Sequence, residues 1–564
     1  MFAWDCCGWD QLVEPYVPET QPFCLPSPLP EWPIGNGFAG NRIRLGELEV
    51  VKITEFETIW SLSNSRAKNS GVIFIKPVSL PDGFYSLGDT YRVIESRSHV
   101  YVLAARESSH EDEDDGTTSE LPPLQKPLKY KLIWGSESQR DGSCFFWLPK
   151  PPEGYKSMGI VVTESPEEPS IDEVRCVRED LTEYCERFEL VLNLNPKSAK
   201  SCFQMWNIRP YRRGINARGV SVGTFYCQTK ETEEDVQTDI ACLKNLDLSL
   251  HAMPNCNQIH ALIKNYGPTM YFHPEESYFP SSVQWFFKNG ALLYEDGVSG
   301  GESIKYGGSN LPDGGVNDGH YWIDLPVDDD DREFVKRGNM ESAELYVHVK
   351  PAIGGTFTDI AMWVFCPFNG PSAIKVGGMS VQMTRLGQHV GDWEHFTLRV
   401  SNFTGELWQV FFSEHSGGRW VDASELEFLE DNKPVVYSSK HGHASYPHPG
   451  TYLQGSTKLG IGVRNDVAQS QFYIDSSTRY QLIAVDHLEE DTVEAPNWLQ
   501  YMRKWGPTIV YNSRSEIDKF ISSLPFYIRS SVENLIYSLP IEIYGEEGPT
   551  GPKEKDNWLG DEKP

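Results

Sequence analysis

Residues 389–395 read HVGDWEH and bring two carboxylates, two imidazoles and an indole into one short stretch. On a β-strand, successive side chains point to opposite faces. Asp392 and Glu394 are therefore expected on one face, and Trp393 and His395 on the other. His389 has the wrong parity for the carboxylate face and reaches it only if the chain bends, which the glycine between them permits. The stretch predicts a loop histidine that meets two strand carboxylates.

This combination of groups is typical of a divalent-cation site. His389, Asp392 and Glu394 supply one imidazole and two carboxylates, and Asn369 can add an amide or backbone oxygen. An oxygen-rich set suits Mg²⁺, Ca²⁺ or Mn²⁺, whereas Zn²⁺ prefers more His or Cys. The alternative is a metal-free strand with two solvated acids, in a protein that serves only as a structural interaction partner.

Two further polar clusters follow the motif. His415 lies in FSEHSGG, and His441 and His443 lie in HGHASYPH. Together with Trp393 and His395, these histidines are expected to contact a ligand. A metal could activate water with one of them as acid or base, so the alternative function is a metal-dependent hydrolase. The sequence holds no nucleophile elbow, P-loop or zincin motif, so we predict no catalytic residue and favour a non-enzymatic role.

Length and charge restrict the function further. A chain of 564 residues exceeds the usual size of one core, so two or more domains are expected. Lys+Arg 50 against Asp+Glu 80 gives a net charge of −30, which argues against a nucleic-acid partner. No stretch is apolar for long enough to span a bilayer, and the start lacks the basic region of a secretion signal. The 11 Cys are expected to be mostly reduced, with Cys6-Cys7 an exposed reduced pair rather than a lipid anchor.

The first part of the chain repeats one pattern three times. Each copy has an aromatic strand that ends in Pro, then a Gly-centred turn, then a second Gly before the next strand. The copies begin at Val72–Pro77, Cys144–Pro149 and Phe203–Pro210, and their second glycines are Gly88, Gly159 and Gly223. Three such repeats predict a three-fold all-β unit whose sheets close on one another.

The phrase Pro-x-Gly-Tyr/Phe-x-x-Leu/Met-Gly, present at 81–88 and 152–159, resembles the β-prism domains of endosomal and vacuolar sorting proteins. The resemblance implies that this part of the chain docks on membranes or on sorting machinery.

The string His-x-x-Asp-Trp-Glu-His resembles the signature heptapeptide of the necrosis-inducing cytolysin family, whose members are β-sandwiches with a bound divalent cation. The strand at 361–365, the motif, SEHSGG at 413–418 and HGH at 441–443 come in the family's order. This resemblance implies His389, Asp392 and Glu394 as cation ligands. The family's remaining acidic ligand falls near Asn369, and an amide there lowers the charge of the site. Toxin activity is not implied, because this chain lacks a secretion signal.

The whole chain resembles the vacuolar protein sorting-associated protein 62 family, from its opening at Phe23–Trp32, Ile43–Ile53 and Trp60 onward. The resemblance implies a role in vacuolar or endosomal sorting. We expect a non-catalytic peripheral membrane or adaptor protein, cytoplasmic and able to associate with endosomal or vacuolar membranes. Its cation, Mg²⁺ or Ca²⁺, would hold an anionic lipid or sugar head group, and its partners would be lipid head groups or sorting machinery. A hydrolase of phosphoesters or glycolipids is the alternative.

These observations predict a mainly β protein with a few helices. Residues 259–266 place apolar side chains at helical spacing between Pro254-Asn255 and Gly267, and a second amphipathic helix is expected near 514–538. The expected order is an N-terminal extension (1–35), a three-fold β-prism-like domain (36–230), a helical connector (231–267), a cytolysin-like β-sandwich with the cation site (268–512), a C-terminal helical segment (513–544) and a disordered acidic tail (545–564).

Overall fold

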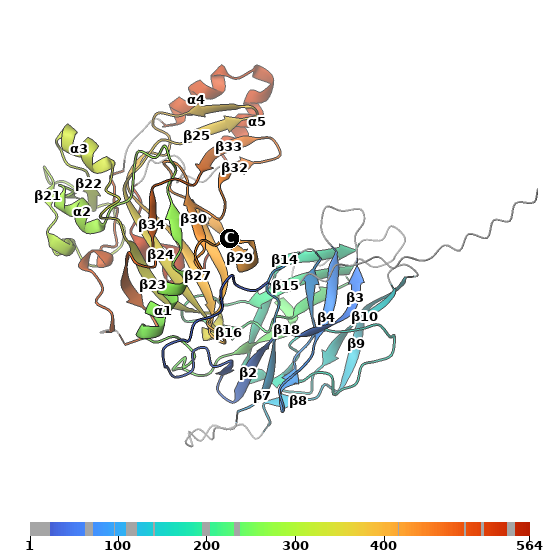
Figure 1. The fold of residues 1–564 in the computed structure, drawn as a ribbon. Coiled ribbons are helices and arrows are strands. Elements are labelled where there is room, and N and C mark those ends of the chain that lie inside the picture. The colour runs from blue at the N-terminus through green and yellow to red at the C-terminus, as the bar shows by residue number, and fades with distance from the viewer. Residues whose placement is uncertain are drawn as a thin grey trace, which may run out of the picture.

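The computed structural model confirms a mainly β fold. It describes residues 23–62, 71–94, 96–108, 121–138, 142–194, 203–229, 237–415, 417–489, 492–508, 513–538 and 548–563. Cys6 and Cys7 lie outside the described residues. No helix among the described residues is both long and apolar enough to cross a membrane. The chain builds two β-rich parts that lie side by side (Figure 1).

The first part contains three sheets of one plan, which confirms the predicted three-fold repeat (Figure 1). In each sheet, a long hairpin is followed by a strand that returns to pair with the second strand of that hairpin. The three sets are β3 (Phe56–Leu62), β4 (Val72–Pro77) and β6 (Thr90–Val93); β9 (Lys129–Ser138), β10 (Gly142–Lys150) and β12 (Val161–Thr163); and β14 (Thr182–Leu194), β15 (Phe203–Pro210) and β17 (Phe225–Gln228).

Shorter strands complete this part. They are β1 (Arg42–Arg44), β2 (Leu48–Ile53), β5 (Tyr85–Ser86) and β7 (Val102–Glu107); β8 (Leu124–Gln125), β11 (Tyr155–Lys156) and β13 (Cys176–Arg178); and β16 (Gly219–Val220) and β18 (Gln237–Lys244). The 3₁₀-helix η1 (Glu179–Leu181) lies between β13 and β14. Each repeat thus has one short strand near its Gly-centred turn (β5, β11 or β16) and one later strand that ends the repeat (β7, β13 or β18).

The second glycines of the first two repeats, Gly88 and Gly159, meet Thr224 of the third repeat at the centre of the three sheets. A Cβ atom on Gly88 would lie 2.9 Å from the Cα of Gly159, and one on Gly159 would lie 2.7 Å from the Thr224 side chain. The N–H of Asp89 donates a hydrogen bond to the carbonyl of Ile160 at 2.9 Å, which links the first repeat to the second. Glycine is required at positions 88 and 159, because the neighbouring backbone and the Thr224 side chain leave no room for a Cβ atom.

Around this centre the three hairpins bury aromatic rings against one another. Phe74 of β4 meets Phe146 of β10 with ring centroids 4.9 Å apart, and Phe146 meets Phe203 of β15 at 4.8 Å. All three side chains are fully buried. Edge-to-face and tilted ring pairs of this kind add stability beyond that of the buried apolar area. The aromatic residues that marked the repeats in the sequence therefore form their common core.

Asp89, one residue after the first central glycine, is buried and accepts a hydrogen bond from the N–H of Val162 at 2.8 Å. Burial raises the pKa of Asp89 to about 7, although this hydrogen bond and the charge of Lys76 act in the opposite direction. The folded protein therefore holds the proton of Asp89 more tightly than the unfolded chain does.

We expect the free energy of unfolding to fall as the pH rises from about 4 to about 7, by up to about 4 kcal/mol from Asp89 alone. The contribution of Asp89 to the free energy of unfolding is fully present below the pKa that Asp89 has in the unfolded chain, because both states are then protonated. As the pH rises, Asp89 ionises in the unfolded chain first, which stabilises that state, so the contribution is lost. The Asp89→Asn variant should show a flatter pH profile in urea unfolding, whereas Asp82→Asn, at an exposed turn, should keep the wild-type profile. Identical profiles for wild type and Asp89→Asn would contradict this expectation.

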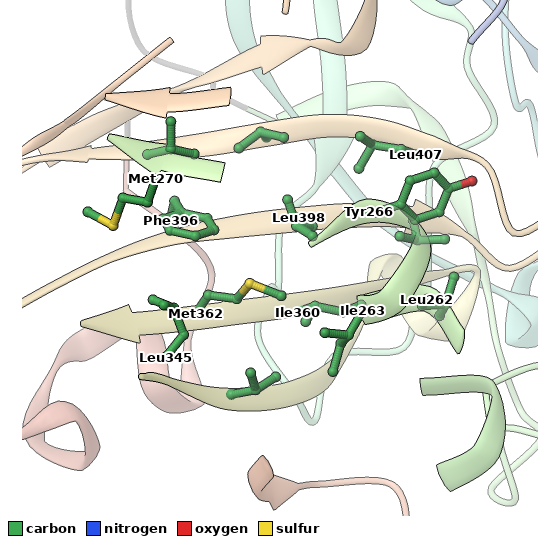
Figure 2. Packing of buried hydrophobic residues seen from close by; sticks show 14 of the residues in the cluster. Leu262, Ile263, Tyr266, Met270, Leu345, Ile360, Met362, Phe396, Leu398 and Leu407 are labelled. Atoms are coloured by element: carbon green, nitrogen blue, oxygen red, sulfur yellow. The ribbon is translucent and has the colours of Figure 1, made fainter. Parts of the chain in front are cut away.

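Helix α1 (Cys256–Tyr266) forms as predicted. Asn255 caps its first turn in a capping box with Gln258, and the N–H of Gly267 donates to the carbonyl of Ile263 at its end. Its apolar side chains Leu262, Ile263 and Tyr266 point toward the strands beneath it (Figure 2). The predicted helical connector at 231–267 is wrong in its first half, because β18 occupies 237–244 and pairs with β14 in the third repeat.

The second part of the chain is a β-sandwich. One layer is a six-stranded sheet in the order β29 (Gly417–Asp422), β28 (Leu407–Glu414), β27 (His389–Ser401), β24 (Phe357–Asn369), β23 (Leu345–Ala352) and β35 (Tyr480–Val485). The other layer contains β19 (Thr269–Tyr271), β30 (Val435–Ser438), β31 (Ser445–Tyr446) and β34 (Tyr473–Asp475). Every residue of β24 is buried, as its apolar sequence predicts.

The core of this sandwich lies between the two layers and α1. Met270 of β19 faces Phe396 of β27, while Ile360 and Met362 extend the same core along β24 (Figure 2). A second core on the opposite face of the large sheet is rich in tryptophan, with Trp363 and Trp505 fully buried. The central strands are therefore covered on both faces and form a rigid support for their side chains.

Smaller elements surround the sandwich. They are the sheet β20 (Leu292–Glu295), β21 (Glu302–Ser303) and β22 (Tyr321–Asp324); the sheet β25 (Ala373–Val376), β26 (Met379–Gln382), β32 (Gly450–Ser456) and β33 (Ile461–Val467); the helices α2 (Val283–Lys288) and α3 (Asp329–Lys336); and the 3₁₀-helices η2 (Tyr306–Gly308), η3 (Ile353–Gly355), η4 (Ala423–Glu425) and η6 (Asn497–Gln500).

The helix predicted near 514–538 is two helices, α4 (Ser513–Ser523) and α5 (Phe526–Ile536). Pro525 divides them because its ring cannot continue a helix. Their apolar side chains pack on the sheet of β25 and β33, where Ile517 and Val532 join Ile374 in one cluster. The C-terminal helical segment thus packs on the second part of the chain.

The predicted disordered tail is wrong for residues 548–563. This segment forms the 3₁₀-helix η8 (Pro552–Glu554) and the short helix α6 (Asp556–Leu559). Trp558 is 3% exposed and stacks on His348 with ring centroids 3.9 Å apart. Glu562 is buried beside Thr397, whose hydroxyl donates to it at 2.6 Å. A few well-placed contacts order a segment whose composition alone predicts disorder.

The two parts of the chain contact one another directly. The N–H of Asn41 donates to the carbonyl of Phe403 at 2.7 Å, and the Asn245 amide donates to the carbonyl of Gly354 at 2.7 Å. Lys52 of β2 pairs with Glu406 at 3.3 Å, and its ammonium lies 4.7 Å from the ring centroid of Trp408. Backbone and side-chain bonds thus join the first two strands and β18 to the edge of the sandwich.

Candidate functional site

The predicted ligands lie on two neighbouring strands of the large sheet. β27 pairs antiparallel with β24, and the register sets His389 opposite Asn369, Asp392 opposite Cys366, and Glu394 opposite Val364. Directly opposed residues of an antiparallel pair place their side chains on the same face. The pairing therefore brings Asn369 next to the start of the motif.

The alternation along β27 is the one expected from a strand. Asp392 and Glu394 are 5% and 8% exposed and share one face. Trp393 lies on the other face, where its ring packs 5.0 Å from that of Phe365 in the tryptophan-rich core. His395 stacks on Trp363 and hydrogen-bonds to Glu562 at 3.0 Å. Trp393 and His395, expected to contact a ligand, are thus placed away from the carboxylates.

Gly391 produces the predicted bend. Its φ is +64°, and a Cβ atom there would lie 2.5 Å from the carbonyl oxygen of Trp505, so only glycine fits. After the bend, Nδ1 of His389 lies 2.7 Å from the Gly391 carbonyl. Nε2 of His389 then lies 3.9 Å from Oδ1 of Asp392. His389 is thus the first residue of β27 and not a loop residue, and it lies near Asp392, one of the two carboxylates that it was expected to meet.

His443 approaches Asp392 more closely than His389 does. Its Nδ1 donates to Oδ2 of Asp392 at 2.7 Å, and its Nε2 donates to the carbonyl of Tyr278 at 2.8 Å. Burial by itself lowers the pKa of His443, but contacts with Cys366 and Asp392 raise it well above the ordinary value. His443 and Asp392 therefore form a buried ion pair in which both imidazole nitrogens carry hydrogen.

The other two predicted histidines border this pair. His415, His441 and His443 all adopt left-handed backbone conformations, with φ of 56°, 67° and 51°. Nε2 of His415 lies 3.1 Å from Oδ1 of Asn465, and Nδ1 of His441 lies 3.2 Å from the carbonyl of Pro371. Non-glycine residues in this conformation are uncommon and cluster at functional sites.

Two buried carboxylates on one face repel each other. Burial first, and then the charge of Asp392, raises the pKa of Glu394 to about 8. The pKa of Asp392 is lowered: burial acts to raise it, but the hydrogen bond from His443 and the charges of His389 and His443 outweigh burial. At neutral pH the pair thus holds one negative charge on Asp392 and one proton on Glu394.

Several residues of the cluster were not predicted. The hydroxyl of Ser413 donates to Glu394 at 3.0 Å. Glu276 is 7% exposed and accepts hydrogen bonds from the backbone N–H groups of Tyr278 and His441, at 2.8 and 2.7 Å. It fixes the 441–443 loop against the loop at 276–278. Nothing in local sequence spacing connects these segments, since each lies far from the others along the chain.

The donor types of this cluster suit a hard cation, because they combine carboxylate and amide oxygens with an imidazole. Their arrangement is that of a hydrogen-bonded cluster. The Asn369 amide donates to the carbonyl of Gly387 at 2.6 Å, and Asp392 and Glu394 each accept a hydrogen bond. Within the described ranges, no three His, Cys, Asp or Glu side chains adopt metal-centre geometry. A cation would have to displace hydrogen from these oxygens.

Comparisons with known proteins point to one family. The family model described as "Vacuolar protein sorting-associated protein 62" matches residues 19–562. Vacuolar protein sorting-associated protein 62 of Saccharomyces cerevisiae is 23% identical over 283 residues, which cover 43% of this chain and 58% of the yeast protein. A second yeast relative, also 23% identical, is covered over 48% of its length. This chain therefore spans about half the length of the curated relatives it matches.

Solved structures with similarity to this chain include two proteins. GNIP1Aa from Chromobacterium piscinae has a TM-score of 0.27 and 14% identity, over 38% of this chain and 40% of that one. Necrosis and Ethylene inducing Protein 2, from the causal agent of cocoa's Witches Broom disease, has a TM-score of 0.18 and 16% identity, over 33% of this chain and 67% of that one. TM-scores this low carry no argument about fold or function.

Proposed function

This chain belongs to the vacuolar protein sorting-associated protein 62 family, and from that premise we propose that it acts in sorting to the vacuole as a non-catalytic binding protein. Its binding site is the carboxylate face of β27. The observation that carries this proposal is the buried pair Asp392 and Glu394 on one face, with His389 turned toward Asp392 by Gly391.

A divalent cation of the Mg²⁺ or Ca²⁺ type would be held by His389, Asp392 and Glu394, with the Asn369 oxygen as a weaker donor. The support is electrostatic. Two carboxylates buried side by side favour the binding of positive charge, and in the described geometry this charge comes from His443 and from a proton on Glu394. The bound cation would then attract an anionic lipid or sugar head group, at an endosomal or vacuolar membrane.

The same geometry favours binding over hydrolysis. A general acid or base needs a nitrogen that can reach a substrate or a water. Both nitrogens of His443 are hydrogen-bonded within the protein, and His415 and His441 each have one nitrogen near a protein oxygen. These contacts hold the loops in place around β27.

The Asp392→Asn variant is expected to bind Ca²⁺ or Mg²⁺ about 10- to 100-fold more weakly than the wild type, because one charged ligand is lost. Isothermal titration of the full chain measures the affinity. Titrations in two buffers of different ionisation enthalpy also measure the protons released, and ligand protons must leave when a cation binds. Flotation with anionic vesicles, with and without EDTA, tests whether the bound cation is needed for binding to an anionic lipid head group.

Glu333→Gln is the matched control, because Glu333 is an exposed acid on α3 that pairs only with Lys336 among the described residues. It should bind cation and vesicles like the wild type. Vesicle binding that is insensitive both to EDTA and to Asp392→Asn would remove the cation from the proposed function. A protein that binds no cation at all would do the same.

A further inference from the structure

Two adjoining cavities, of about 480 and about 650 Å³, lie between the three-fold repeats and the edge of the large sheet. Tyr101 from the repeats and Trp408 and Trp420 from the sandwich line both of them. In Figure 1 this region lies between the pair β14 and β15 and strand β29, where the C-terminus is marked. Cavities of this size are typical of small-molecule sites.

One wall of the cavities is aromatic. Trp408 of β28 and Trp420 of β29 come from neighbouring strands of the sandwich. The ring of Tyr101 meets that of Trp408 edge to face, with centroids 5.3 Å apart. Arg399 lies over Trp420, 3.9 Å from the ring centroid. Trp408 is 6% exposed, with His99 stacked on its ring at 4.2 Å and the Lys52 ammonium 4.7 Å from its centroid, whereas Trp420 is partly exposed. Trp420 therefore offers the more accessible apolar surface of this wall.

The facing wall of the smaller cavity is basic. Arg209 is the next-to-last residue of β15, and Arg212 and Arg213 follow the strand, so three guanidinium groups lie within five residues. Arg209 and Arg213 share one carboxylate, that of Glu186. Arg212 is exposed, and in the described parts of the chain it has no hydrogen bond or ion pair. Guanidinium groups bind phosphate oxygens in a bidentate manner.

The carboxylates that line the cavity already form hydrogen bonds or ion pairs within the protein. Asp359 accepts two hydrogen bonds from Arg399, both at 2.8 Å. Asp561 lies between two arginines, 3.3 Å from Arg399 and 3.3 Å from Arg213. Five cations, Arg209, Arg212, Arg213, Lys350 and Arg399, thus face five carboxylates, those of Glu186, Glu189, Asp359, Asp561 and Glu562. Glu189 and Glu562 accept hydrogen bonds from Asn207 and Thr397, so among the described contacts Arg212 is the cation of this wall left to bind an anion.

The C-terminal segment forms the third wall and fixes the others. The N–H of Ile215 donates to the carbonyl of Leu559 at 3.0 Å, beside the arginine turn. Lys350 of β23 donates to the carbonyls of Asn557 and Gly560. Glu562, which lines the cavity, is anchored to His395 of β27. Hydrogen bonds thus connect the repeats, the sandwich and the C-terminal segment around the cavity, and they fix the positions of its walls.

We propose that this cavity is a second ligand site, separate from the carboxylate face of β27, and that it takes a phosphorylated sugar-like ring. The phosphate binds at Arg212 and Arg213, and the ring packs against Trp420. The same chemistry occurs in a free inositol phosphate and in the head group of a phosphoinositide. The net charge of the chain does not oppose this at short range, because salt screens charges beyond about 8 Å.

Isothermal titration of the full chain with soluble inositol hexakisphosphate, in EDTA, tests the site without any contribution from a cation. Flotation with phosphatidylcholine vesicles, with and without a phosphoinositide, tests the lipid source. Arg212→Gln is expected to weaken binding of the phosphate probe roughly tenfold, and binding should also fall as salt is added. Trp420→Phe, which keeps a ring, should cause a smaller loss.

Arg332→Gln is the control, because Arg332 is a partly exposed arginine on α3 at the far side of the sandwich. It should leave binding unchanged. Binding to the soluble probe would identify a free phosphate compound as the ligand, and binding only to phosphoinositide vesicles would identify the lipid head group. Either result supports the site if Arg212→Gln weakens the binding. No binding to either probe, or equal binding by Arg212→Gln and wild type, overturns the proposal. Neither result bears on the EDTA-sensitive binding proposed for β27.

Discussion

The Gly223→Ala variant is expected to lose about 4 kcal/mol or more of the free energy of unfolding of the repeats. Gly223 has φ of +86°, where an L side chain is strained. A Cβ atom there would also overlap the carbonyl oxygen of Tyr101, a backbone atom that cannot move aside. The neighbouring N–H of Leu103 donates to the carbonyl of Val222, so a shift would break a bond between two repeats.

Gly83→Ala separates the two causes of this loss. Gly83 has nearly the same backbone conformation, with φ of +79°, but a Cβ atom there would meet nothing within 4 Å. Its loss should be limited to the conformational strain, about 1–2 kcal/mol. Urea unfolding followed by near-ultraviolet circular dichroism, together with proteolysis, measures both variants. Equal losses at the two glycines would show that close packing of the repeats is not the cause.

The Trp558→Ala variant is expected to lose about 3–5 kcal/mol of the free energy of unfolding of the sandwich. The indole is 3% exposed, belongs to the tryptophan-rich core and stacks on His348. Its removal leaves a cavity in the core and frees the segment that carries Glu562. Since that segment also closes the interdomain cavity, binding of the phosphate probe should weaken as well.

Leu559→Ala is the matched control for this substitution. Leu559 is the next residue in the chain and is 61% exposed, so its loss should stay within about 0.5 kcal/mol. Thermal unfolding of both variants, followed by tryptophan fluorescence, gives the comparison. A Trp558→Ala protein as stable as Leu559→Ala would mean that residues 548–563 contribute little to the core.

Local patterns were enough to predict much of this architecture. The alternation along 392–395 correctly assigns the faces of β27, and Gly391 is correctly identified as the bend. The repeats at 72–77, 144–149 and 203–210 correctly predict three equivalent hairpins. Each of these inferences depends on geometry within a few residues, where side-chain period and turn chemistry act directly.

The features that sequence could not predict depend on distant partners. The segment 548–563 has the composition of a disordered tail, and its order comes from His348, Lys350, His395 and Thr397 in the central sheet. The pairing of His443 with Asp392 likewise joins a loop to strand β27, and no local spacing relates the two. The break of the predicted helix at Pro525 has a local cause, because proline interrupts a helix, whereas strand β18 depends on its pairing with the distant strand β14.

The meeting of Gly88, Gly159 and Thr224 at one point has a consequence for the origin and the folding of the repeats. One repeat alone would leave its hairpin aromatic ring in water and its central residue, Gly88, Gly159 or Thr224, without these neighbours. It could bury them only by associating with two identical copies around a rotation axis, as a homotrimer. Covalent linkage supplies those neighbours at high effective concentration. The three repeats are therefore one cooperative unit, in which removal of any copy deprives the other two of their core.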